Sequence, residues 1–177
     1  CDVEFEDILP GMNTAWHTSS LLAKTPLLAD PPDFYYVAAE YGFGDYPYGI
    51  WLRHNGPVRF IARTMSAYRI CSNDSSWSSG VEGRYDKLTR FMTGAVAMLE
   101  AYRPHVTDPG VLALVDDNIL KWKFQLLYTQ GKDKELRRPP YNRLLKAKPL
   151  RFRINNAVKC LFPALHRLYR RKQGYDE

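Results

Sequence analysis

The amino-acid sequence predicts an α+β protein of three parts: a mixed region over residues 1–80, a helical hairpin over 81–131 and a basic amphipathic tail over 132–177. Three observations support this division. The first part contains short apolar runs typical of strands and one capped helix. The second has apolar residues at three- and four-residue steps, which indicates helices. The third concentrates Lys and Arg.

The charge is divided unequally along the chain. Residues 132–177 hold 14 of the 25 Lys and Arg but four of the 19 Asp and Glu. The net charge of +6 therefore comes from the tail, while the rest of the chain contains more acidic than basic residues. Any surface that binds an anionic partner is expected in the tail.

Composition also limits the class of protein. With 177 residues, 45% of them apolar, the chain is long enough for a globular core. Cys1, Cys71 and Cys160 are odd in number and widely spaced, so neither a disulfide framework nor a structural zinc site is expected. No apolar run approaches the roughly 18–20 residues that span a bilayer. The cysteine pattern makes a reducing cytoplasm the expected location. The chain opens on Cys1 without a leader pattern, so we expect no signal peptide and a piece of a longer chain.

The first part mixes strands, loops and one helix. Apolar runs predict strands at residues 17–23, 58–62 and 65–70. Two segments rich in Pro, Ser or Asn, residues 30–33 and 72–80, predict loops.

The helix in the first part follows the motif Gly44-Asp45-Tyr46-Pro47. Residues 48–54 are predicted to be helical and to stop at Asn55-Gly56, while Asp45 and Pro47 suit a first helical turn. A carboxylate at a helix N-terminus is stabilised as the anion. Asp45 is therefore either a cap that satisfies backbone N–H groups, the commoner case, or a residue with a chemical role.

The second part is predicted to be an antiparallel pair of helices. The first begins near Arg84, and the second begins at Asp108-Pro109, a cap followed by proline, and ends before Gly131. Their apolar stripes are expected to be core rather than a cofactor surface. The stripes contain Leu88, Phe91, Met92, Ala95, Val96, Leu99 and Tyr102, then Leu112, Val115, Ile119, Trp122 and Leu126.

The tail is predicted to form short helices separated at Pro139-Pro140, Pro149 and Pro163. One face is apolar, and basic residues surround it. Such a segment either lies on an anionic membrane surface or packs on its own domain with a solvated basic face. Nucleic acid is not expected, because aromatic stacking platforms do not alternate with the cations. The apolar face consists of Ile154, Val158, Leu161, Phe162, Leu165 and Leu168.

The order of motifs between Phe5 and Ser79 resembles the acceptor-side half of bacterial family 2 glycosyltransferases of the GT-A fold. The family's strand of the type "ED-L-L … N … H-T-S-S" is similar to Phe5-Glu6-Asp7-Ile8-Leu9 followed by Asn13 to Leu22. Its helix "GD-aromatic-P" is similar to Gly44-Asp45-Tyr46-Pro47. The strand after that helix resembles Asn55-Gly56-Pro57-Val58-Arg59-Phe60-Ile61, and the family's "M-S-V-Y-R" and "S-W-S" resemble Met65-Ser66-Ala67-Tyr68-Arg69 and Ser76-Trp77-Ser78.

This resemblance implies an inverting transfer of a sugar from a nucleotide-sugar donor to a hydroxyl of a glycan or lipid-linked acceptor, in the synthesis of bacterial cell-surface polysaccharide. The family's base maps onto Asp45, and such a base takes the hydroxyl proton as the oxygen attacks the anomeric carbon. The location implied is the cytoplasm, with peripheral contact at the inner face of the cell membrane.

Other positions carry over from the same resemblance. Gly44 precedes the base, Arg69 is placed to meet donor phosphate, and Trp77 offers an apolar face to a sugar ring. Thr18 and Ser19 are placed in the acceptor cleft. Each also has an ordinary structural explanation: a salt bridge for Arg69, packing under a loop for Trp77, and backbone hydrogen bonds for Thr18 and Ser19.

The resemblance implies a divalent cation, Mg²⁺ or Mn²⁺, in the intact enzyme, bound mainly by an Asp-x-Asp motif that residues 1–177 do not contain. No metal ligand is assigned in this chain. Cys71 stands where relatives often have a ligand His, and thiolate suits these oxygen-preferring ions poorly. His17 is a lone histidine that is better explained as a core residue. We therefore expect this chain alone neither to bind donor nor to turn over.

Two other classes of protein remain open. In the first, the chain is a non-enzymatic helical membrane-surface or interaction module and Asp45 is only a cap. In the second, which the sequence favours least, it is a basic nucleic-acid-binding protein.

Overall fold

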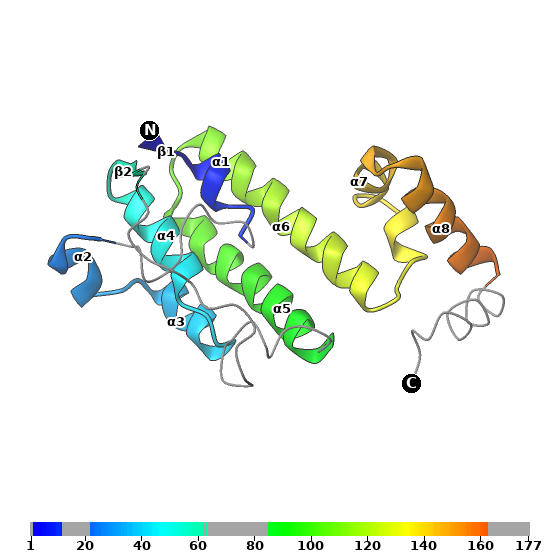
Figure 1. Ribbon diagram of the computed structural model, residues 1–177, viewed down its shortest axis with the longest axis horizontal. Helices are drawn as coiled ribbons and strands as arrows, with labels where there is room; N and C mark the ends of the chain where they lie inside the picture. The colour runs from blue at the N-terminus through cyan, green and yellow to red at the C-terminus, as the bar shows by residue number, and fades with distance from the viewer. Residues whose placement is uncertain (1, 12–21, 62, 64–84, 163–177) are drawn as a thin grey trace. The chain divides into compact units, whose positions relative to one another are not determined.

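The computed structural model describes residues 2–11, 22–61, 63 and 85–162, which are mostly helical and include one two-stranded sheet (Figure 1). The predicted α+β class is confirmed in the sense that the described residues form both helices and a small sheet. Contacts group the chain into two compact units, Cys1–Lys123 (unit 1) and Phe124–Glu177 (unit 2). The division into three parts at residues 80 and 131 stays a prediction.

Unit 1 begins with the sheet. Strand β1 (Asp2–Val3) pairs antiparallel with β2 (Val58–Arg59), so that Asp2 faces Arg59 and Val3 faces Val58. Arg59 Nε donates to Asp2 Oδ1 at 3.2 Å, an exposed pair that adds little stability. The strand predicted over residues 58–62 is confirmed at its first two residues.

Helix α1 (Phe5–Ile8) corrects one expectation from the sequence. The resemblance implies that the segment Phe5 to Leu9 belongs to a strand, but residues 5–8 are helical. The Asp7 carboxylate accepts the backbone N–H of Glu4 at 2.9 Å, which satisfies an N-terminal donor and starts a helical turn. The turn buries Phe5 and Ile8 in unit 1.

Two helices that the sequence did not predict follow in unit 1: α2 (Thr25–Ala29) and α3 (Asp33–Glu40). The predicted loop at residues 30–33 is one residue shorter, because Asp33 is already helical after the extended Pro32. An acidic residue in the first turn favours this start. Helix α4 (Asp45–His54) follows, and its end at Asn55 confirms the predicted stop.

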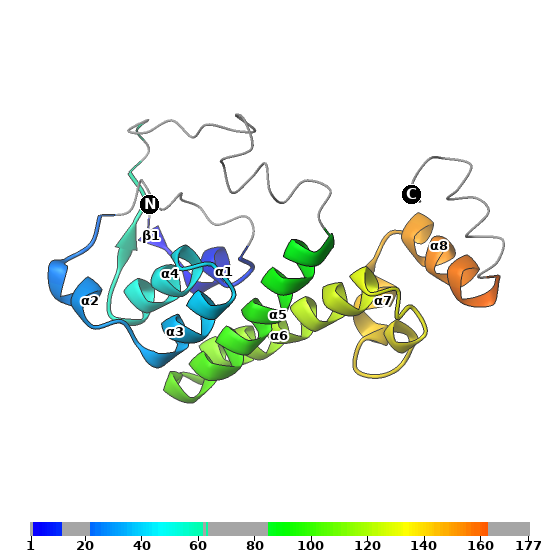
Figure 2. The ribbon, with the colours of Figure 1, turned by 90° about the horizontal axis from the view of Figure 1, so that it is seen from below.

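The helical hairpin is confirmed. Helix α5 (Tyr85–Tyr102) and helix α6 (Pro109–Thr129) run antiparallel and lie side by side, joined through the 3₁₀ turn η2 (Arg103–His105) (Figures 1 and 2). Asp108 Oδ1 accepts the N–H of Val111 at 2.9 Å, as its predicted capping role requires. Within unit 1, Glu100 of α5 pairs with Lys123 of α6, and Arg103 of η2 pairs with Asp116 of α6, both at 2.7 Å.

The core of unit 1 lies where α3, α4 and α5 meet. Phe34, Ile50, Leu99 and Tyr102 are fully buried, and the rings of Phe34 and Tyr102 pack edge to face with centroids 5.1 Å apart. Most of the apolar stripe predicted for α5 is buried here: Met92, Ala95, Val96, Leu99 and Tyr102.

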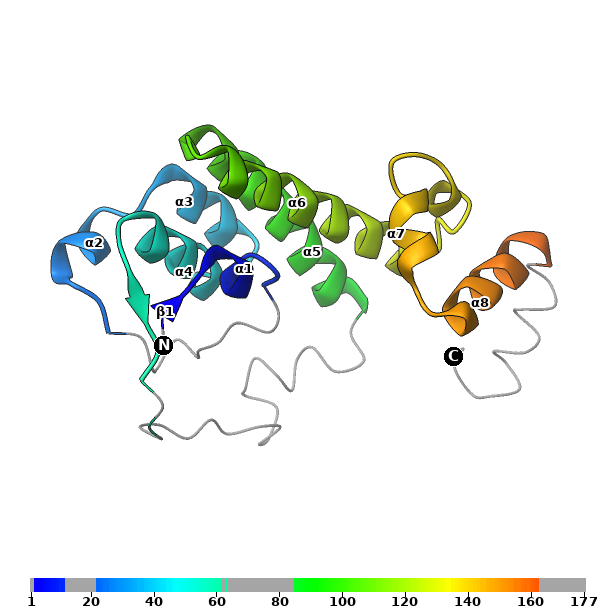
Figure 3. The same ribbon diagram turned by 90° about the horizontal axis from the view of Figure 1, so that it is seen from above.

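Unit 2 contains the 3₁₀ turn η3 (Glu135–Arg137), α7 (Asn142–Ala147) and α8 (Leu150–Leu161) (Figure 3). The predicted breaks at Pro139-Pro140 and Pro149 are confirmed, and the break at Pro163 lies outside the described residues. The core of this unit is formed by Phe124, Leu136 and Leu145.

Several predicted elements lie partly or wholly outside the described residues: the strand over 17–23, the strand over 65–70 and the loop over 72–80. Leu22 and Ala23, the described end of the first of these, have no regular structure. Among the described helices, none combines the length and apolar character that a membrane span requires.

Candidate active site

Asp45 is the first residue of α4, and the residue before it, Gly44, is the N-cap. The Asp45 carboxylate is half-buried, and its Oδ1 accepts the backbone N–H of Tyr46 at 2.9 Å. It therefore satisfies one of the donors that a helix leaves unpaired in its first turn. Its place in the first turn puts the side chain near the positive end of the α4 dipole.

The turn that carries Asp45 is held by α5. Gly94 of α5 lies so close to this turn that a Cβ atom there would be 2.5 Å from Cβ of Tyr41 and 2.8 Å from Cε1 of Phe43. Arg90, one helical turn earlier, donates to the carbonyl of Glu40 at 2.6 Å and satisfies a C-terminal carbonyl of α3. The end of α3 and the start of α4 are thus fixed against the same helix.

Two aromatic residues anchor the motif on either side of Asp45. Phe43 is buried against Phe91, with ring centroids 4.9 Å apart. The buried hydroxyl of Tyr46 donates to the carbonyl of Leu9 at 2.6 Å, which joins α4 to the turn after α1. Burial raises the pKa of Tyr46 well above its usual range, so this hydroxyl stays a hydrogen-bond donor. With Phe43 and Tyr46 buried, Asp45 between them lies at the boundary of core and solvent.

A tyrosine pair lies beside Gly44, the residue before Asp45. The rings of Tyr35 on α3 and Tyr48 on α4 have centroids 4.5 Å apart. A Cβ atom at Gly44 would lie 3.0 Å from the Tyr35 hydroxyl oxygen, so the absence of a side chain at Gly44 lets Tyr35 approach. Tyr48 follows Asp45 by three residues and so shares its side of α4. Partial burial raises the pKa of Tyr48, and the neighbouring Tyr35 hydroxyl adds to the shift.

This part of the molecule contains a carboxylate and two partly exposed phenol groups. The carboxylate can accept a proton from a hydroxyl within hydrogen-bond reach. Each tyrosine offers an apolar ring face together with a polar tip, a combination that suits a ligand with both C–H and O–H groups. A sugar has both kinds of group.

The other end of α4 has a different character. His54 Nδ1 lies 3.2 Å from the Tyr102 hydroxyl, and the His54 ring stacks on Trp51. Burial lowers the pKa of His54, and His105 nearby lowers it further; burial also raises the pKa of Tyr102 to about 12. His54 follows Asp45 by nine residues, about 13 Å along a helix, so this cluster belongs to the packing of unit 1 and not to the Asp45 site.

The structure describes two of the six site residues predicted from the sequence. Gly44 and Asp45 are adjacent and open the helix as the motif predicts. Thr18, Ser19, Arg69 and Trp77 lie outside the described residues, as do His17 and Cys71. Their roles stay predictions.

The structure bears on a metal cofactor, and comparisons with known proteins bear on relatives. Within residues 2–11, 22–61, 63 and 85–162, no three His, Cys, Asp or Glu side chains come together as a set that can hold a metal ion. Searches against family models, curated proteins and solved structures give no significant match to this chain.

Tyr35 and Tyr48 are not among the site residues predicted from the sequence. Tyr48 had a local signal, since it follows Asp45 at the three-residue spacing that places two side chains on one side of a helix. Tyr35 had none, because its approach to Gly44 depends on how α3 packs against α4.

Proposed function

We propose that this chain is the acceptor-side, C-terminal part of an inverting glycosyltransferase of the family 2 type, in which Asp45 is the general base. One observation carries the proposal: half-buried Asp45 opens α4 directly after Gly44, which the Tyr35–Tyr48 pair approaches. The ordered series of motifs between Phe5 and Ser79 supports it. Resemblance to bacterial enzymes of cell-surface polysaccharide synthesis supplies the class of acceptor, a glycan or a lipid-linked sugar.

In the proposed reaction an acceptor hydroxyl oxygen attacks the anomeric carbon of the donor sugar. The bond between that carbon and the nucleotide oxygen breaks, and the nucleotide leaves with the bonding electrons. Asp45 takes the hydroxyl proton as the new carbon–oxygen bond forms. Tyr35 and Tyr48 orient the acceptor through a ring face and their hydroxyl groups.

The donor is assigned to a part of the enzyme outside these 177 residues. In the family, an Asp-x-Asp motif holds Mg²⁺ or Mn²⁺ against the donor diphosphate, and this sequence contains no such motif. The described residues provide no alternative set of ligands. No step is therefore assigned to a metal in this chain, and the isolated chain is expected to be inactive.

The test is Asp45→Asn in the full-length enzyme that the proposal implies. The amide keeps the size of the side chain and an oxygen that can accept the Tyr46 N–H, but it cannot take a proton. We expect kcat to fall about 10²–10⁴-fold, while the urea midpoint of unfolding stays nearly unchanged.

Asp33→Asn is the matched control, because Asp33 is the first residue of α3 as Asp45 is of α4, and it is exposed. It should leave turnover intact. Near-normal turnover by Asp45→Asn, or an equal loss in both variants, would remove the base assignment.

The alternative function, a non-enzymatic membrane-surface or interaction module, predicts no sugar transfer by the full-length protein at all. Contact between unit 2 and a membrane is compatible with both functions and does not separate them. Measured sugar transfer by the full-length protein separates the two functions.

A further inference from the structure

The outer face of α8 presents apolar side chains to solvent. Leu150, Ile154 and Leu161 are 65%, 54% and 69% exposed. At about 100° per residue their spacing places the three within an arc of about 40°, so they form one stripe along the helix. We refer to these three residues as the outer stripe.

The opposite face of α8 is fixed to unit 2. The ring of Phe152 packs on Tyr128 with centroids 4.8 Å apart, and Lys159 Nζ lies 4.5 Å from the centre of the same tyrosine ring. Asn156 is buried and donates to Asp133 Oδ1 at 2.7 Å. These residues lie about half a turn from the outer stripe. Turning α8 to bury the stripe would break all three contacts.

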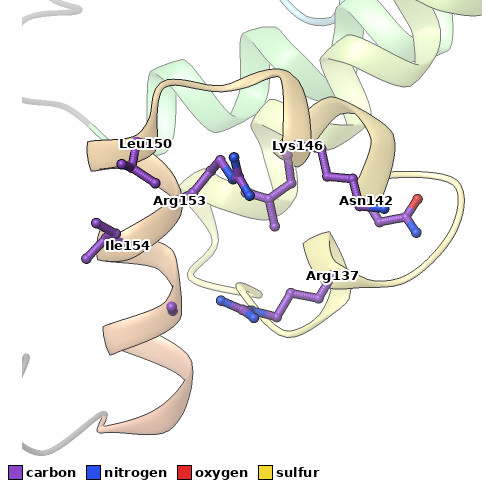
Figure 4. Close-up of a pocket in the computed structure, with 8 residues that line it drawn as sticks. Arg137, Asn142, Lys146, Leu150, Arg153 and Ile154 are labelled. Atoms are coloured by element: carbon purple, nitrogen blue, oxygen red, sulfur yellow. The ribbon is translucent and has the colours of Figure 1, made fainter.

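A cationic hollow of about 420 Å³ adjoins the stripe between η3, α7 and α8. Arg137, Lys146 and Arg153 come from these three elements, and Leu150 and Ile154 of the outer stripe line the same space (Figure 4). Among the described residues that line the hollow, none is acidic. Within the described part of the chain, none of the three cations forms an ion pair.

Charge in the surrounding region has the same sign. Residues 124–162 contain ten Lys and Arg and two acidic residues, Asp133 and Glu135. Asp133 is buried in its hydrogen bond with Asn156, so it does not compete for the hollow. The local field therefore attracts an anion.

We propose that the outer stripe and the cationic hollow together dock on an anionic phospholipid bilayer. A headgroup phosphate enters the hollow between Arg137, Lys146 and Arg153, and the outer stripe enters the boundary of headgroups and acyl chains. Guanidinium groups suit phosphate oxygens because their donors are arranged in a planar fork.

The combination of apolar and cationic side chains selects this partner. A free phosphate or a nucleic acid would satisfy the cations but leave the outer stripe in water. A bilayer accepts both, since its interface has phosphate and hydrocarbon within a few ångströms. The proposal concerns unit 2 alone and does not depend on the reaction assigned to Asp45.

The experiment is flotation of the 177-residue chain with vesicles of phosphatidylcholine alone or with about one-third phosphatidylglycerol, at fixed salt. One variant combines Arg137→Gln, Lys146→Gln and Arg153→Gln. Its control combines Lys132→Gln, Lys134→Gln and Arg138→Gln, which removes the same charge from exposed positions that do not line the hollow.

We expect the unchanged chain to bind the anionic vesicles and to bind phosphatidylcholine alone much more weakly. Each cation near an anionic surface strengthens binding about fivefold, so loss of the hollow should weaken binding by about 100-fold. The control should weaken it only a few-fold. Equal losses in the two triple variants would show diffuse attraction and overturn the hollow as a site.

The apolar half of the proposal has its own test. Ile154→Ser with Leu161→Ser should weaken vesicle binding at least tenfold, whereas Leu22→Ser with Ile61→Ser, exposed positions in unit 1, should not. Far-UV circular dichroism verifies that each variant is folded. Unchanged binding by the α8 variant would overturn the assignment of the stripe. So would a chain that binds single-stranded RNA but no vesicle.

Discussion

Replacing Gly94 with alanine tests whether α5 holds the turn that carries Asp45. The added methyl carbon would lie 2.5 Å from both Cβ and Cγ of Tyr41 and 2.8 Å from Cε1 of Phe43. Carbon atoms in contact are normally about 3.5–4.0 Å apart, so the overlap is about 1 Å. Because Cβ of Tyr41 is attached to the backbone, a rotamer change cannot remove it, and α3 and α5 must separate.

Two opposing effects set the size of the change. Alanine favours an interior helical position over glycine by about 1 kcal/mol. Overpacking a well-packed site costs about 1–3 kcal/mol, and an overlap with a backbone-attached carbon belongs at the upper end. The free energy of unfolding should therefore fall by about 1–2 kcal/mol, or about 4–8 °C in Tm for a unit of this size.

Urea unfolding followed by tryptophan fluorescence reports on the unfolding of unit 1, which contains Gly94. All four tryptophans, Trp16, Trp51, Trp77 and Trp122, belong to unit 1. Lys87→Ala is the control, because it places alanine in the same helix as Gly94, at an exposed position. It should change the free energy by no more than about 0.5 kcal/mol. A Gly94→Ala protein as stable as the unchanged chain would refute the role given to α5.

Two further predictions concern the same unit. Tyr46→Phe removes the hydroxyl bonded to the Leu9 carbonyl and leaves that buried acceptor unpaired, so the free energy of unfolding should fall by about 1–2 kcal/mol in the same urea titration. Tyr36→Phe, an exposed position, should change nothing, and equal effects would contradict the argument. Burial lowers the pKa of His54, so below about pH 6.5 the unfolded chain binds more protons than the folded one and stability should fall on acidification. His54→Gln should flatten that decline between about pH 7 and 5, and an unchanged pH profile would remove His54 as its source.

The helical hairpin was predictable because its signals are local. The apolar period of α5, the Asp108 cap and the Pro109 start depend on residues within one or two turns of one another. Helices α2 and α3 were missed because they are short, and short helices are stable only when packed on a partner. For α3 that partner is α5, more than 40 residues later in the chain.

In the candidate site, too, the features with a local signal were predictable and those that depend on packing were not. Asp45 was found from a helix start, and the structure places it there. The approach of Tyr35 to Gly44 and of Gly94 to Tyr41 depends on the packing of α3, α4 and α5. No spacing in the sequence determines such contacts, since each joins residues from different elements.

By itself the sequence determined where the hairpin helices begin and end, that α8 has an apolar stripe, and that the tail carries the positive charge. These follow from hydrogen bonding and periodicity within a few residues. Only the tertiary structure decided which face of α8 is buried. The buried face contains Phe152, Asn156 and Lys159 because Tyr128 and Asp133 lie against it. Periodicity predicts a stripe, but burial depends on the partner that the folded chain brings to it.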